Sequence, residues 1–129
     1  MFALLFFGVV TAAVYATRSE LTVTTVGRAG TAQSLADADQ TNGDKFQNDG
    51  RTFLILNNLT GATTATITVL TGSTYGGFAV GNQAITLNPA ATKIVGPFNK
   101  AIFDQTSTDA GYVYLDYSAA TSVTLMVIH

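Results

Sequence analysis

The acidic stretch DADQTNGDKFQNDG, residues 37–50, is the part of the sequence richest in oxygen ligands for a cation. It contains four of the eight acidic residues, Asp37, Asp39, Asp44 and Asp49. An EF-hand loop needs Asp or Asn at its fifth position, Gly at its sixth and Glu at its twelfth. Here these positions hold Thr41, Asn42 and Asn48. We therefore predict a polar connection over this stretch, with Gly43 and Gly50 supplying the positive φ angles of tight turns.

Side chains for nucleophilic catalysis are scarce. The chain has no cysteine, which excludes disulfides, thiolate zinc sites and cysteine nucleophiles. Its single histidine is His129, the last residue. A Ser-His-Asp triad or a two-histidine metal site would depend on a terminal residue, and chain ends tend to fray. We therefore expect no enzymatic activity, no metal site and no cofactor.

One tripeptide matches an acceptor site for N-linked sugar. Asn58-Leu59-Thr60 has the required pattern and falls between two predicted strands, where a glycan would be accessible. The alternative is an Asn-rich hairpin turn without a sugar.

The charge balance excludes one class of partner and favours another. Charged residues make up 11% of the chain and the net charge is -2, with six scattered Lys and Arg. Phosphate binding needs clustered basic residues, so we expect no nucleic-acid partner. A neutral, Thr-rich surface is easily covered by a neighbour, which favours a homo-oligomer.

From Leu21 onward the elements that would position these residues are strands. Apolar residues recur with period two and β-branched residues are frequent. The predicted strands are residues 21–26, 51–56, 64–70, 83–88, 92–96, 101–105, 112–117 and 122–128. A short helix within 32–38 is an open alternative to a loop. We predict an all-β fold, one β-sandwich or jelly-roll-like domain of about eight strands over residues 21–129.

Alternation along two of these strands assigns their faces. In residues 64–70, Ala65, Ile67 and Val69 should face the core. In residues 112–117, Tyr112 and Tyr114 share a face with Asp116, opposite Val113, Leu115 and Tyr117.

We predict that the first 20 residues form an apolar N-terminal anchor or assembly segment, as a helix or an arm. No charge precedes Arg18. As a helix, residues 1–17 would extend about 25 Å, short of the roughly 30 Å hydrocarbon core of a bilayer. A bilayer, the core of a filament and the space between subunits all remain open as the environment that buries it. The anchoring side chains are Phe2, Leu4, Leu5, Phe6, Phe7, Val9, Val10, Val14 and Tyr15.

Three stretches of the β region are similar to a known group of proteins. They are residues 21–58, which include NGDKFQNDGRTFLILNN, residues 94–105, IVGPFNKAIFDQ, and residues 111–128, GYVYLDYSAATSVTLMVI. In these stretches the chain resembles small virion structural proteins of tailed bacteriophages, of the head-decoration type. The resemblance implies a compact β-sandwich and a non-enzymatic role on a particle surface. Residues 1–20 lie outside it.

These observations lead to three hypotheses of function. The first is a structural subunit of a virion that binds its own copies and a major capsid protein, with residues 1–17 as a buried anchor. The second is a pilin-like subunit of an extracellular surface filament, with the N-terminal helices in its core. The third is a carbohydrate-binding module that uses Tyr75, Tyr112 or Tyr114 as a sugar platform.

Overall fold

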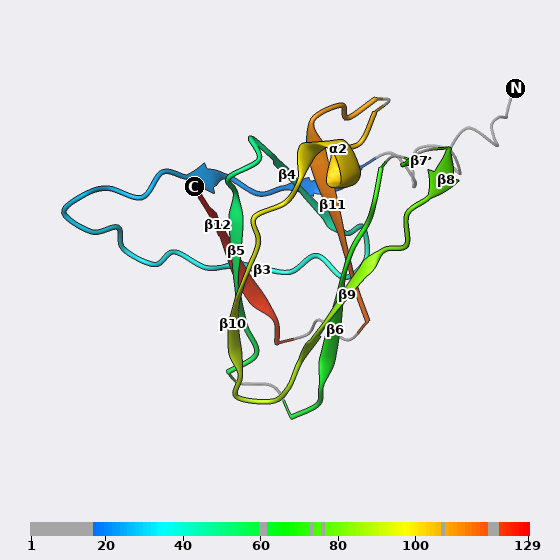
Figure 1. The fold of residues 1–129 in the computed structure, drawn as a ribbon. Helices are drawn as coiled ribbons and strands as arrows, with labels where there is room; N and C mark the ends of the chain where they lie inside the picture. Colours follow the sequence, from blue (N-terminus) through cyan, green and yellow to red (C-terminus); the bar gives the residue numbers. More distant parts are fainter. Residues whose placement is uncertain (1–16, 60–61, 73, 76, 107, 119–121) are drawn as a thin grey trace, which may run out of the picture.

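The computed structural model describes residues 17–59, 62–72, 74–75, 77–106, 108–118 and 122–129. The large apolar side chains of the predicted anchor, from Phe2 to Tyr15, therefore lie outside the described residues. The described part is an all-β structure with one short helix, and two mixed sheets form its body (Figure 1). The all-β prediction is confirmed, and the first strand starts at Ser19, two residues before the expected boundary.

The first sheet has five strands in the order β1-β4-β11-β6-β9. Their bounds are β1 Ser19–Glu20, β4 Asp44–Gln47, β11 Tyr112–Tyr117, β6 Ala65–Val69 and β9 Gln83–Leu87. All pairs are antiparallel except β1 with β4. Strand β9 forms one edge of this sheet.

The second sheet is built on β12 and β5. Its strands are β10 Thr92–Val95, β5 Phe53–Asn57, β12 Thr124–Ile128, β2 Val23–Thr24 and β3 Ala36–Asp37. Strand β5 pairs with β10 on one side and with β12 on the other, and β2 and β3 share the far side of β12. A separate ribbon pairs β7 (Thr74–Tyr75) with β8 (Phe78–Ala79).

The N-terminal segment joins the two sheets along one side. Strand β1 pairs in parallel with β4 of the first sheet, and β2 pairs in parallel with β12 of the second. Leu21, between the two strands, is buried in the core cluster. A short extended segment therefore closes this side of the body with one apolar side chain.

The core lies between the two sheets, as period-two alternation predicts. The predicted inward positions of β6 are confirmed, because Ala65, Ile67 and Val69 are buried. Val113 and Leu115 of β11 are buried as well, and Leu54 and Leu125 cover them from the second sheet.

The strand predicted over residues 101–105 is wrong. A one-turn helix, α2 (Lys100–Phe103), occupies this place. The side chain of Asn99 caps it by accepting a hydrogen bond from the Ala101 backbone N–H at 2.8 Å. Phe98 and Phe103 then pack edge to face, with ring centroids 5.5 Å apart, over the end of the core. The cap and this aromatic contact outweigh the strand propensity of the segment.

Two other local expectations need correction. Residues 32–38 contain no helix, and Ala36–Asp37 forms strand β3. The polar connection over 37–50 is interrupted by β4, whose Phe46 is fully buried between the sheets. The turns on either side are as predicted, because Gly43 and Gly50 have φ angles of 77° and 86°.

Candidate functional site

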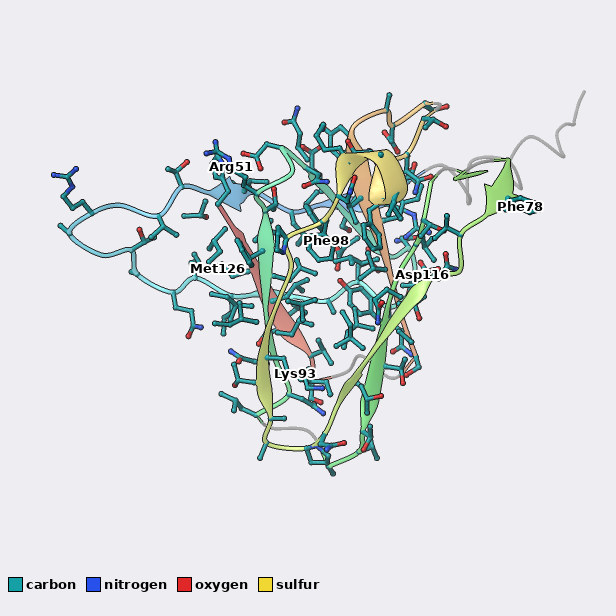
Figure 2. All side chains as sticks on the ribbon, in the orientation of Figure 1. Arg51, Phe78, Lys93, Phe98, Asp116 and Met126 are labelled. Carbon is teal, nitrogen blue, oxygen red and sulfur yellow. The ribbon has the colours of Figure 1, made fainter. Side chains whose placement is uncertain are left out.

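The outer side of the second sheet carries a continuous apolar surface. In register, Ile94 of β10 lies beside Ile55 of β5, which lies beside Met126 of β12. Ile128 lies beside Phe53 in the same sheet. With Val26 these residues define the apolar face: Val26, Phe53, Ile55, Ile94, Met126 and Ile128. Figure 2 places Met126 on the side of this sheet away from Phe98, which lies toward the core.

The apolar face is open to solvent at two of its ends. The side chain of Ile94 is 68% exposed and that of Val26 is 50% exposed. A cleft of about 210 Å³ lies among Val26, Ile55, Met126 and Ile128 and continues to Thr31 and Gln33. Met126 is only 6% exposed and Ile55 is half-buried, so the exposed apolar side chains of the face are those of Ile94 and Val26. Exposed aliphatic side chains beside an apolar cleft are typical of a surface that binds another protein.

A long loop projects from the sheet next to this face. Residues 25–35 connect β2 to β3 and extend well beyond the body of the molecule (Figure 1); they are called the arm below. Its tip is a turn in which the Gly27 N–H donates to Thr31 Oγ1 at 2.7 Å, and the Gly30 N–H donates to the Gly27 carbonyl at 3.0 Å. At its end, the Ser34 N–H lies 3.4 Å from Met126 Sδ. The arm is therefore anchored at its base and exposed along its length.

The C-terminal histidine fixes the base of the arm. His129 Nδ1 lies 2.7 Å from Asp49 Oδ2, and its Nε2 lies 2.8 Å from Thr25 Oγ1. The hydrogen bond from the Arg51 backbone N–H, and to a smaller extent the hydrogen bond with the His129 side chain, lower the pKa of the Asp49 carboxyl to about 2. Backbone bonds from Val26 N–H to the His129 carbonyl and from His129 N–H to the Thr24 carbonyl continue the pairing.

This Asp-His-Thr arrangement brings together residues that are 80 and 104 positions apart. It has the connectivity of a nucleophile, base and carboxylate. The side chains of His129 and Asp49 are 31% and 39% exposed, however, so water competes for their hydrogen bonds. The direct effect of this geometry is structural: His129 bridges Thr25, the first residue of the arm, and Asp49.

The tyrosines proposed as a sugar platform lie on the outer side of the first sheet, under basic side chains. The guanidinium carbon of Arg18 lies 4.3 Å from the ring centroid of Tyr114, and Lys45 Nζ lies 5.1 Å from that of Tyr112. Burial, with Asp109 as the hydrogen-bond acceptor of its hydroxyl, raises the pKa of Tyr114 to about 12. Both rings thus already carry a cation on a face that a sugar would stack on. The side chain of Tyr75 lies outside the described residues.

The acidic residues of 37–50 are used within the protein. Asp39 accepts hydrogen bonds from Ser19 Oγ at 2.6 Å and from the Thr41 and Asn42 N–H groups. Asp44 is buried and accepts from Tyr117 Oη at 2.6 Å. Within the described part of the chain, no three His, Cys, Asp or Glu side chains are grouped to hold a metal ion.

The expectation that Asn58 would offer an accessible glycan site is wrong, because this residue has no exposed surface. Its Nδ2 donates to the carbonyls of Thr63 at 2.9 Å and Leu87 at 3.1 Å, and its Oδ1 accepts from Ser122 Oγ at 2.8 Å. A side chain with both donors and its acceptor engaged inside the fold joins three segments of the chain.

Sequence reasoning missed the apolar face, although the sequence contains a signal for it. The runs Phe53–Ile55 and Leu125–Ile128 are apolar at consecutive positions, so these strands are apolar on both sides. Comparison with protein-family models, curated proteins and solved structures finds no significant match to this chain. No helix in the described part of the chain has the length and apolar character needed to cross a bilayer.

Proposed function

We propose that this protein is a non-enzymatic structural subunit of a virion, a capsid-associated or decoration-like protein that binds its own copies and a major capsid protein. The observation that carries the proposal is the apolar face, which an all-β body presents to solvent beside a projecting arm. Burial of apolar surface is the main favourable term in protein association, at about 25 cal/mol per Å².

A second exposed apolar group supports contact with more than one kind of neighbour. Phe78 on β8 is 79% exposed and projects from the β7–β8 ribbon at the other end of the molecule (Figure 2). Full burial of a Phe side chain contributes about 1.5–3 kcal/mol. In this proposal the apolar face binds a like subunit, and Phe78 anchors the domain on the capsid protein.

The proposal also includes the N-terminal segment and the finer fold. Residues 1–17 act as a further buried anchor, most of which lies outside the described residues. The domain is proposed to be jelly-roll-like because the chain changes sheet repeatedly, from β3 to β4, from β4 to β5 and from β5 to β6. In the filament alternative, copies of the chain assemble with helical symmetry into fibres and are not part of a virus particle.

The test has two arms. Purified virus particles from the source of this sequence should contain the chain at a fixed ratio to the major capsid protein by quantitative mass spectrometry. Phe78→Ser should lower incorporation into particles, while the matched exposed variant Thr86→Ser should not. Absence of the chain from particles, or helical fibres of the full chain in electron micrographs, would contradict the virion role, and fibres would favour the surface filament.

A further inference from the structure

We propose that the apolar face is the contact between two copies of this chain, related by a two-fold axis near Ile55, with the arm of each copy lying over the other. The inference rests on the proposed function and specifies which surface joins like subunits. In such an isologous contact the same patch serves both partners, so a residue at one end of the row meets the residues at the other end.

The row of side chains across the sheet has the required symmetry. Ile94 lies on β10, Ile55 on the central strand β5 and Met126 on β12. Neighbouring strands are about 4.8 Å apart, so Ile94 and Met126 lie at similar distances on either side of Ile55. One end is a protruding side chain, because Ile94 is 68% exposed. The other end is the cleft of about 210 Å³ beside Val26 and Met126. A two-fold axis near Ile55 places Ile94 of each copy at the cleft of the other.

The outward positions of the three central strands carry no charge, so this part of the surface is compatible with itself. The outward positions of β10, β5 and β12 are occupied by Thr92, Ile94, Phe53, Ile55, Asn57, Thr124, Met126 and Ile128, all of which are uncharged. Around a two-fold axis a charged patch would face its own sign, which costs free energy. Charged residues border this surface but do not occupy its outward positions: Lys93 on β10 pairs with Leu56, which faces the core, Asp37 lies beside Thr124, and Arg28 lies on the arm.

The area of the sheet explains why the arm belongs to the interface. Three strands about 4.8 Å apart and five residues long, at about 3.3 Å each, present about 240 Å². A stable interface buries roughly 800 Å² per partner, with weaker specific contacts near 500 to 600 Å². The arm runs out to its tip and back, so its roughly ten residues form two runs of about 16 Å each, and at a width of about 10 Å these add about 330 Å². Face and arm together thus reach about 570 Å² per copy, which the face alone does not.

The chain contains no cysteine, so engineered thiols test this contact directly. A mixture of Val26→Cys and Ile94→Cys proteins, each in the full chain, is oxidised gently, and disulfide dimers are identified by intact mass. The proposal predicts that the mixed dimer exceeds either homodimer several-fold. A disulfide requires Cα atoms within about 7 Å, so only copies that meet through the face will be trapped.

The matched control replaces either protein by Thr86→Cys, an exposed residue on edge strand β9 of the other sheet. Mixtures that contain it should give dimers in statistical proportion only. The inference is overturned if Val26→Cys with Ile94→Cys also gives statistical proportions. If virus particles still contain the chain in that case, the virion role stands and like subunits meet through a different surface. If the particles also lack the chain, the proposed function is rejected as well.

Discussion

Replacement of Asn58 should show how strongly a single buried amide holds the two sheets together. In Asn58→Ala the Leu87 carbonyl loses a buried hydrogen bond, which costs about 1–3 kcal/mol, and the bonds to Thr63 and Ser122 cost roughly 0.5–1.5 kcal/mol each. The expected loss is about 3 kcal/mol, a large part of the roughly 5–15 kcal/mol that stabilises a domain of this size. It corresponds to a fall in Tm of about 12 °C.

The assay is urea unfolding followed by circular dichroism, with Asn88→Ala as the control at an exposed turn position. The control should change the unfolding free energy by less than about 0.5 kcal/mol. Asn58→Asp adds a second measurement, because its carboxylate would face two carbonyl oxygens at a fully buried position. That variant should gain stability as the pH falls and the carboxyl is protonated. A loss below about 1 kcal/mol in Asn58→Ala, or no pH dependence in Asn58→Asp, would refute this reasoning.

Two further predictions concern local packing and buried charge. Gly72→Ala should lower the unfolding free energy by about 3 kcal/mol in thermal melts, because its Cβ would lie 2.2 Å from the Asp104 carbonyl oxygen. Gly81→Ala, which meets nothing within 4 Å, should have little effect, and equal effects would contradict the clash. Burial raises the pKa of Asp44 above its ordinary value, so the folded chain binds the extra proton and its stability falls as the pH rises through that window. Asp44→Asn removes this pH dependence, so the unfolding free energy of the variant should rise relative to that of the unmodified chain between about pH 4 and pH 7. Parallel pH profiles of the two proteins would contradict this prediction.

The sequence predicted most of the second sheet and the inner face of the first, because alternation is a local property. Ala65, Ile67 and Val69 are buried as their spacing requires. The sequence did not predict the strand Asp44–Gln47, because Phe46 is the one apolar residue among polar neighbours there. Asp44 and Phe46 both point inward there, and the hydrogen bond that Asp44 accepts from Tyr117 offsets the burial of a carboxyl. Because Tyr117 is 73 residues away from Asp44, no local sequence pattern indicates that the two side chains meet.

The candidate site was less predictable than the fold. The contact of His129 with Asp49 and Thr25 depends on how β2 and β12 pair, and no spacing in the sequence encodes that pairing. Asn58 was misread for the same reason, since a polar tripeptide between strands resembles an exposed turn until its partners are known. The apolar face was detectable, because unbroken apolar runs in two paired strands give their sheet a second apolar side in addition to the one that faces the core.

The most direct test of the central claim is the sedimentation velocity of the full chain beside Ile94→Asp and the control Thr86→Asp. A charge at Ile94 would meet the apolar cleft of the second copy, whereas the same charge at Thr86 lies on the edge of the other sheet. The account predicts that the unmodified chain and Thr86→Asp sediment as the same oligomer and that Ile94→Asp sediments as a smaller species. An unmodified chain that sediments as a monomer, or an Ile94→Asp variant indistinguishable from it, would contradict the account.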